Sequence, residues 1–291
     1  MKFFAIVSVL VLLFAGGCNA ELSQSIGLEG VRNARELGGY QAENGRTVKH
    51  GVLLRTAELS GATSRDILRL QEVYHLAVVA DFRMSLEVAS HSDPVIQGAE
   101  NLHLRIMDED AVRRALTSSE DLAMLMNGDK IGVLIKAVEK GVVGEQMYID
   151  FLSGAQGKNG YSRMFRELLE LPEGRAFLFH CTQGKDRTGC AAMLILSALG
   201  VDEKTILADF ELTNSFNAAL IQAQRKMLQD RGYSGEELDR LMKAMDEVDP
   251  QYMVNAINWI KQNYGSVVGY ISGELGVTPQ ELEALKGKFL E

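Results

Sequence analysis

The sequence predicts an α/β fold in which helices flank a mostly parallel central sheet. Three observations predict it. In the first 200 residues, short apolar segments rich in β-branched residues alternate with helical patterns. One such segment, 176–179, is apolar without alternation, as expected of a strand buried on both faces of a parallel sheet. From Val201 onward the pattern is helical. Strands that alternate with helices favour a sheet covered on both faces.

The elements can be assigned in chain order. Four segments are expected to be strands: 48–56, 76–82, 101–106 and 176–179. A helix is expected to open at Thr63, where a polar cap precedes apolar residues at helical spacing. In segment 161–171 apolar residues recur every three or four positions, and Pro172 follows its end. Segment 189–199 is apolar on nearly every side, as a buried helix would be, and Gly200 ends it.

Segment 108–160 shows no strand pattern. It carries two or three helical patterns with interspersed glycines, and it lies between a strand and the helix that leads to segment 176–179. We expect a helical insertion that is either a lid over a pocket or a layer packed permanently on the core. Length alone permits one large domain or two small ones.

Composition excludes several classes of function. The chain has 291 residues, of which 46% are hydrophobic, enough for a sizeable core. Its net charge of −9 argues against broad binding to nucleic acid or to anionic membranes, which requires a basic face. We therefore expect no nucleic-acid partner.

Residues 1–20 have the layout of a secretory signal peptide: a basic start at Lys2, an apolar run, then small residues. The segment that ends at Cys18 resembles the lipobox of bacterial lipoproteins, although Ala15 stands where leucine is usual. The alternative is ordinary cleavage after Ala20. We expect an exported protein, either a cell-envelope lipoprotein or a periplasmic or secreted one, with an N-terminal lipid anchor as its contact with the membrane.

After export two cysteines remain, Cys181 and Cys190, too few for a disulfide framework. Cys190 lies one turn into the predicted buried helix, so we expect a small core residue. Cys181 lies at the junction between the strand and that helix. Loops at the carboxyl ends of such strands bind ligands, and free N–H groups and the helix dipole make the helix start an anion site.

A thiolate would be stabilised at this position, because catalytic thiols at helix starts ionise far more readily than free ones. Arg187 adds a planar fork that can bind two phosphate oxygens. Together they allow in-line attack on phosphorus without a metal or other cofactor. A Walker A loop is excluded because Asp186 follows Gly184-Lys185. A zinc site would need more ligands than the adjacent His180.

Segment 180–189, HCTQGKDRTG, matches H-C-x-x-G-x-x-R-[ST]-G, the signature of cysteine-dependent tyrosine phosphatases. Its G-K-D-R-T-G form resembles the bacterial tyrosine phosphatase family 3. Further segments resemble the same branch across nearly all of the mature chain: 33–40 (NARELGGY), 54–59 (LRTAEL), 81–83 (DFR), 208–214 (ADFELTN), and Tyr264-Gly265 with Leu275-Gly276. The resemblance implies a tyrosine-phosphatase-like fold, and its extent implies a single domain over 21–291.

The resemblance also implies roles for the loop. Cys181 would be the nucleophile that forms a phosphocysteine, and Arg187 would bind the phosphate and stabilise the transition state. Thr188 would hydrogen-bond the sulfur, and His180 would position the loop. The phosphate-binding residues would be Thr182, Gln183, Gly184, Lys185, Asp186 and Arg187. Lys185 would either add positive charge for the substrate or point to solvent.

The leaving alcohol needs a proton from a general acid. Asp186 lies inside the loop and is the first candidate, and Asp81, at the end of a strand, is the second. The alternative role for Asp81 is to fix Arg55 or the loop. Asp150 has the spacing that many tyrosine phosphatases use, but its surroundings look helical, so we expect a surface residue there.

The sequence therefore predicts a phosphomonoester hydrolase, most specifically a protein tyrosine or dual-specificity phosphatase with phosphorylated protein as substrate. Two alternatives remain open: a phosphatase for phosphoinositides or other small phosphoesters, and a non-catalytic phosphate-binding module. A sulfurtransferase or an arsenate reductase also uses a cysteine loop, but the Arg187-Thr188-Gly189 ending speaks against both.

Overall fold

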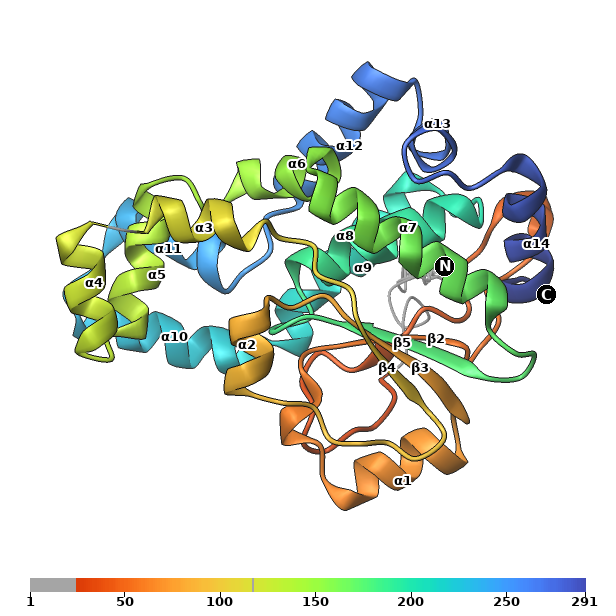
Figure 1. The fold of residues 1–291 in the computed structure, drawn as a ribbon, viewed down its shortest axis with the longest axis horizontal. Coiled ribbons are helices and arrows are strands. Elements are labelled where there is room, and N and C mark those ends of the chain that lie inside the picture. The colour runs from red at the N-terminus through yellow and green to blue at the C-terminus, as the bar shows by residue number, and fades with distance from the viewer. Residues whose placement is uncertain (1–24, 117) are drawn as a thin grey trace, which may run out of the picture.

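The structure, a computed structural model, describes residues 25–116 and 118–291 (Figure 1). Its strands are β1 (Arg35–Glu36), β2 (Leu53–Thr56), β3 (Leu76–Asp81), β4 (Glu100–His103) and β5 (Ala176–His180). The elements up to β5 also include η1 (Glu43–Gly45), η2 (Leu59–Gly61), α1 (Ser64–Glu72), α2 (Ser85–Ser90), α3 (Glu109–Ala115), α4 (Ser119–Met126), α5 (Lys130–Glu139), α6 (Glu145–Ser153) and α7 (Ala155–Glu170). After β5 come α8 (Asp186–Ala198), α9 (Glu203–Phe216), α10 (Ala218–Asp230), α11 (Gly235–Met245), α12 (Pro250–Tyr264), α13 (Val267–Gly273) and α14 (Pro279–Phe289).

The sheet has the order β1-β2-β5-β3-β4, and only β1 runs antiparallel to its neighbour within the described residues. The predicted mostly parallel α/β fold is confirmed. β5 is the central strand and all of its residues are buried, as the uninterrupted apolar pattern predicted. Its last residue, His180, pairs in register with Thr56 of β2 and with Asp81 of β3. Three strand ends therefore meet at one edge of the sheet.

The strand bounds differ from the expected ones in several places. The expected strand 101–106 is β4 and ends at His103. The expected strand 48–56 is regular only from Leu53, because the backbone of Val48 instead bridges to Leu290 and its N–H donates to the carbonyl oxygen of Tyr40. Strand β1 has two residues and gave no pattern in the sequence. Helix α1 does open after Thr63, whose hydroxyl and the carboxylate of Asp66 form a reciprocal capping box.

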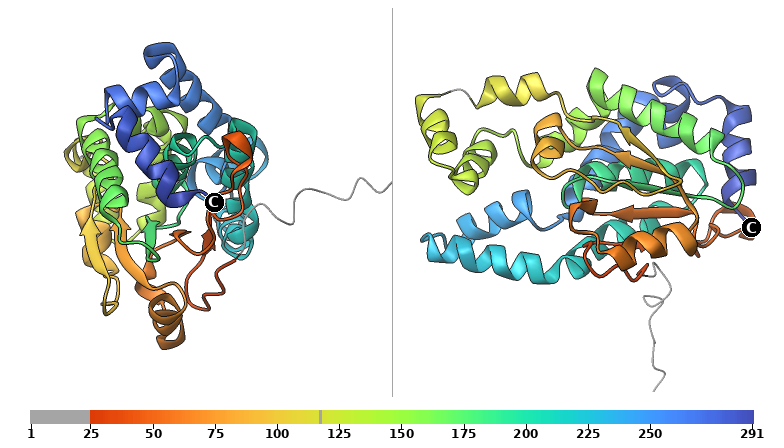
Figure 2. Two further views of the ribbon diagram at one scale, coloured as in Figure 1. Left: turned by 90° about the vertical axis from the view of Figure 1, so that its right-hand side faces the viewer. Right: turned by 60° about the horizontal axis from the view of Figure 1, so that its bottom comes forward.

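Helices cover both faces of the sheet (Figures 1 and 2). On one face, α1 and the N-terminal segment pack against Leu54, Val79 and Leu178. On the other, α6 to α9 and α12 to α14 share one large core with Phe177 and Phe179. Burial of β5 between two apolar layers stabilises this architecture.

The helices α5, α10 and α11 form a third, separate core, built around Ile135, Leu228 and Leu241. This helical lobe projects to the left in Figure 1, away from most of the sheet. The expected insertion 108–160 is helical, but it divides. Helix α5 belongs to the lobe, whereas α6 contributes Tyr148 and Phe151 to the main core. The part of the insertion that includes α6 is therefore a layer packed on the main core, as one of the two expectations had it.

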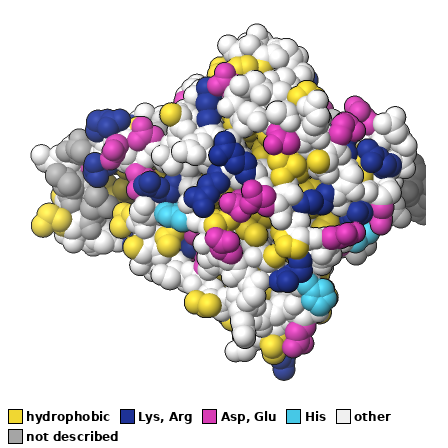
Figure 3. Space-filling model, turned by 45° about the vertical axis from the view of Figure 1, so that its right-hand side comes forward, with side chains coloured by type: hydrophobic (Ala, Val, Ile, Leu, Met, Phe, Trp, Pro, Cys, Tyr) yellow, Lys and Arg dark blue, Asp and Glu magenta, His cyan; other side chains and the backbone are white. Residues whose placement is uncertain are grey.

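Among the described residues, no helix is both long enough and apolar enough to cross a membrane. Acidic and basic side chains are interspersed on the face shown in Figure 3. The expected signal peptide and the lipidation site at Cys18 lie outside the described residues.

Candidate active site

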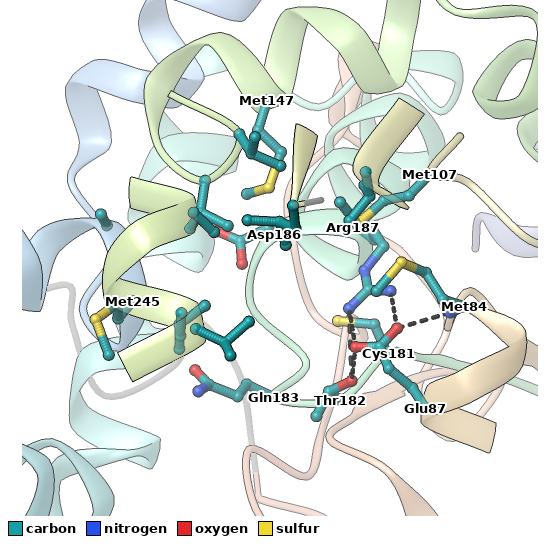
Figure 4. Close-up of a pocket in the computed structure, with 18 of the residues that line it drawn as sticks. Met84, Glu87, Met107, Met147, Cys181, Thr182, Gln183, Asp186, Arg187 and Met245 are labelled. Atoms are coloured by element: carbon teal, nitrogen blue, oxygen red, sulfur yellow. Dashed lines mark hydrogen bonds and ion pairs between the residues drawn. The ribbon is translucent and has the colours of Figure 1, made fainter. Parts of the chain in front are cut away.

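The loop 181–185 joins the end of β5 to the start of α8, so Cys181 follows directly on the central strand and Arg187 lies in the first helical turn. Both are buried, and both line a cavity of about 420 Å³ (Figure 4). Thr182, Gln183 and Asp186 line the same cavity. Five of the residues expected in the site are thus brought to one pocket at the carboxyl edge of the sheet.

Gly184 must be glycine at this position. Its φ is 65°, in the left-handed region, and the loop passes close to the end of β2. A Cβ on Gly184 would lie 2.8 Å from the nitrogen of Ala57 and closer still to the carbonyl of Thr56. The close approach seats the loop against the neighbouring strand and sets its curvature.

Arg187 is oriented by a carboxylate that the sequence did not reveal. Its two Nη atoms donate to Glu87 of α2 at 2.6 and 2.9 Å, a bidentate pair drawn in Figure 4. Glu87 also accepts a hydrogen bond from the hydroxyl of Thr182, at 2.5 Å, and one from the backbone N–H of Met84. Burial alone would raise the pKa of Glu87, but the charge of Arg187 and these donors lower it to about 2. The pair is therefore ionised at neutral pH.

The two general-acid candidates lie in different surroundings. Asp186 lines the cavity, accepts a hydrogen bond from the buried Tyr148 of α6, and lies 3.4 Å from Nζ of Lys185. Asp81 does not line it. Both carboxylate oxygens of Asp81 instead accept from Arg83, at 2.8 to 3.1 Å. Asp186 therefore faces the cavity that contains Cys181, whereas Asp81 is engaged in an internal ion pair.

Asp81 does not fix Arg55, which pairs instead with Asp209 of α9. The Asp81 carboxylate lies 4.0 Å from Nδ1 of His180, the last residue of β5 before the loop. Asp150 is exposed on α6, as expected, and does not line the cavity that contains Cys181. Burial and the negative charge of Asp186 raise the pKa of Tyr148, so its phenol stays protonated and keeps donating.

His180 is buried beside two carboxylates. Its Nε2 lies 3.0 Å from Asp93 and its Nδ1 lies 3.3 Å from the carbonyl oxygen of Cys181. Burial would lower the pKa of His180, but Asp93 and Asp81 raise it. Asp81, Asp93 and His180 are close enough to hold a cation, yet Arg83 already donates to both carboxylates, at 2.8 and 2.9 Å. The guanidinium is the counter-ion of this cluster.

Lys185 takes neither of its two expected orientations. Its side chain is 2% exposed, and Nζ donates to the carbonyls of Ala244, in the last turn of α11, and of Glu247, just beyond it, at 3.3 and 3.1 Å. The Ala244 carbonyl lies at the negative end of the helix dipole, so the ammonium is stabilised there. The loop lysine connects the loop to the helical lobe and does not line the cavity.

Thr188 and Cys190 are both fully buried on α8. The hydroxyl of Thr188 has no hydrogen-bond partner among the described residues, which leaves it available to a neighbouring sulfur. Cys190 is a free thiol in the main core, where burial raises its pKa. Cys190 is the small core residue that its position predicted.

A family model described as "Tyrosine phosphatase family" matches residues 26–291. The chain belongs to this tyrosine phosphatase family. Among curated relatives, it is similar to the "Putative tyrosine-protein phosphatase" of Cupriavidus necator, with 29% identity over 89% of this chain and 86% of the relative. It is also similar to the "Triple specificity protein phosphatase PtpB" of Mycobacterium tuberculosis, with 27% identity over 90% and 98% of the two chains. A tyrosine-protein phosphatase of Nostoc commune matches about half of each chain at 27% identity.

Sequence reasoning missed three residues of this phosphatase site. Glu87 follows Arg83 by four positions in a short helix without a polar cap residue, so nothing marked it. Tyr148 looked like one of several core aromatics. Asp93 lies in a loop between α2 and β4. A signal for Glu87 existed in the buried arginine itself, since a buried guanidinium requires a carboxylate partner.

Proposed function

We propose that this phosphatase hydrolyses phosphomonoesters of proteins, phosphotyrosine first among them, through a phosphocysteine on Cys181. One observation carries the proposal: Cys181, Arg187 and Asp186 line a single pocket at the start of α8. Phosphoryl transfer without a metal requires a nucleophile, a cation and an acid around the phosphate, and these three side chains would supply them.

The reaction would proceed in two steps. In the first, Sγ of Cys181 attacks phosphorus, the P–O bond to the leaving group breaks, and the carboxyl group of Asp186 gives the leaving oxygen its proton. In the second, water attacks phosphorus, the S–P bond breaks, and Asp186 takes a proton from the water. Cys181 returns as the thiolate and inorganic phosphate leaves. Arg187 and the loop amides bind the phosphoryl oxygens throughout.

The supporting residues act on these steps through others. Thr188, whose hydroxyl is free within the described structure, would donate to the sulfur as it departs in the second step. His180 would hold the backbone of Cys181 through its contact with the carbonyl oxygen. Glu87 would keep the fork of Arg187 in one orientation before the substrate enters.

The cavity favours an aromatic ester over a polyanionic headgroup. Beyond the loop it is walled mainly by apolar side chains, including Met84, Met107, Met147, Phe151 and Met245. Besides Arg187, Lys130 is the one basic residue among the described residues that line it. A phosphotyrosine ring can bury its faces on such a wall, whereas each further phosphate of a phosphoinositide would need its own cation.

Turnover of para-nitrophenyl phosphate in the presence of EDTA tests the chemistry. We expect activity in the wild type and in Cys190→Ser, and a loss of at least about 10³-fold in Cys181→Ser. Cys190 is the matched control, because it is equally buried and free but does not line the cavity. Full activity in Cys181→Ser would refute the phosphocysteine.

Substrate class is tested by comparing a phosphotyrosine peptide with phosphoinositide vesicles at equal phosphate concentration. We expect a higher kcat/KM on the peptide. A higher value on the vesicles would assign the enzyme to phosphoinositides and would leave the cysteine chemistry intact.

We also propose that residues 1–20 direct export and that Cys18 receives a lipid, on the sequence pattern alone. Fractionation of cells tests this. Wild-type protein should sediment with membranes and Cys18→Ser should become soluble in the periplasm or medium. Wild-type protein in the soluble periplasmic fraction would support ordinary cleavage after Ala20 instead.

A further inference from the structure

Four polar residues from the family-like motifs have no part in the reaction described above, yet they converge beneath the catalytic loop. Asn33 lies just before β1 and Arg35 is its first residue. Arg55 lies in β2, and Asp209 lies in α9. All four side chains are at most 1% exposed. Burying this many polar groups is unfavourable unless each is paired, so their arrangement calls for an explanation.

Two of them bind carbonyl groups of the loop. Nδ2 of Asn33 lies 3.1 Å from the carbonyl oxygen of Gln183 and 2.8 Å from that of Gly184. Nη2 of Arg55 lies 2.9 Å from the same Gly184 oxygen. These donors come from the segment before β1 and from β2, on the side of the loop where Gly184 approaches Thr56.

These hydrogen bonds to carbonyl groups also set the direction of the loop N–H groups. In a planar trans peptide the C=O and the following N–H point in opposite directions. A donor that holds the Gly184 carbonyl therefore turns the N–H of Lys185 the other way, and a donor on the Gln183 carbonyl does the same for the N–H of Gly184. Hydrogen bonds to a carbonyl also polarise the N–H of that peptide group.

The charges beneath the loop do not cancel. Arg35 and Arg55 both pair with the single carboxylate of Asp209, which also accepts from Tyr40. Burial and the neighbouring Arg35 lower the pKa of Arg55, to about 10, so it remains charged at neutral pH. The three groups carry one net positive charge, fully removed from water, beneath a loop that binds an anion.

The strained backbone of Asn33 is a second indication that its side chain has a specific role. Its φ is 54°, in the left-handed region, which costs non-glycine residues on the order of 1 kcal/mol or more. Arg35 fixes the carboxamide by donating to its Oδ1, so that Nδ2 faces the loop.

We propose that Asn33 and Arg55 are positioning residues of the catalytic loop: they hold the Gln183 and Gly184 carbonyls beneath it, so that the next amides face the phosphoryl group, and the unbalanced charge of Arg55 strengthens anion binding. The inference rests on the proposed phosphatase function. It assigns the family-like segments around residues 33 and 55 to oxyanion binding and not to folding alone.

Inhibition of para-nitrophenyl phosphate turnover by inorganic phosphate is the measurement. In Arg55→Met we expect the inhibition constant for phosphate to rise about 10- to 100-fold, the range for a lost hydrogen bond to a charged group. We expect kcat to fall as well, because the transition state carries more charge on these oxygens. Arg55→Lys keeps the charge and should recover part of the phosphate affinity.

If Asn33 and Arg55 served folding alone, their variants would lose stability without a change in phosphate binding. Leu70→Ala is the control for a loss of stability of that kind. Leu70 is fully buried in α1, in the core on the other face of the sheet. That variant should lose thermal stability and keep the wild-type inhibition constant. Asn33→Gly covers the case in which Arg55→Met fails to fold, because glycine adopts the same φ without strain. It should bind phosphate about tenfold more weakly.

The outcomes separate the two hypotheses. Wild-type protein that neither turns over the ester nor binds phosphate would end the proposed function. Active wild-type protein with wild-type phosphate inhibition in folded Asn33→Gly or Arg55→Met would overturn this inference alone. Equal loss in Arg55→Lys and Arg55→Met would overturn the contribution of charge.

Discussion

The pair between Glu87 and Arg187 gives a quantitative prediction for the variant Glu87→Gln. The pKa of Glu87 is lowered from 4.5 to about 2 in the folded protein. At about 1.4 kcal/mol per pH unit, that difference corresponds to about 3 kcal/mol of folding stability at pH 7. The side chain of Glu87 is 22% exposed, so solvent screening removes little of it.

The pH dependence follows from the sign of the shift. A carboxylate whose folded pKa is depressed stabilises the fold above its unfolded value, and that stabilisation is lost as pH falls from about 4.5 towards about 2. The difference between wild type and Glu87→Gln in the free energy of unfolding should therefore be about 3 kcal/mol at pH 7 and about 1.4 kcal/mol at pH 3.

Urea unfolding at both pH values measures this difference. Glu211→Gln, at an exposed position on α9, is the control and should match the wild type at each pH. A destabilisation of Glu87→Gln that is equal at pH 7 and pH 3 would show that the loss is one of packing and that the ion pair contributes nothing.

Three further predictions concern the loop and its surroundings. Asp186→Asn should lower kcat on a phosphotyrosine peptide by about 10²- to 10⁴-fold and remove the basic limb of the rate–pH profile, whereas Asp81→Asn should keep that limb and lower the melting temperature. Persistence of the limb in Asp186→Asn would transfer the role of acid elsewhere. Gly184→Ala should lower the melting temperature and weaken phosphate inhibition together, because the added Cβ meets the end of β2; wild-type values of both would contradict the seating of the loop. Lys185→Met should cost about 1–3 kcal/mol in urea unfolding, since two buried carbonyls at the end of α11 lose their donor; an unchanged midpoint would place the lysine in solvent.

Much of the catalytic loop could be predicted from local sequence. The apolar run of β5 and the apolar helix α8 are contiguous with the loop, so their pattern located its two ends. Cys181 and Arg187 are separated by five residues. Because the first follows the strand directly and the second lies in the first turn of the helix, both line the same pocket. Nothing distant in the chain is needed for that placement.

The remaining site residues depend on contacts with distant parts of the chain. Glu87 meets Arg187, and Arg55 meets Gly184, only because β2, β3 and β5 end at the same edge. Lys185 looked like a ligand for phosphate because it lies in a short loop that faces the ligand. The carbonyls that bind it belong to backbone at the end of α11, which carries no signature in side-chain identity.

The burial of Lys185 has a consequence for how anions reach the enzyme. With this ammonium facing inward and Arg187 already balanced by Glu87, the loop projects little positive potential into solvent. The chain as a whole carries a charge of −9, which repels free polyanions. Salt screens this repulsion beyond a Debye length, so it is weak in salt and stronger at low ionic strength. Long-range electrostatic steering therefore contributes little to substrate capture, and discrimination among phosphoesters falls to short-range contacts made after the encounter.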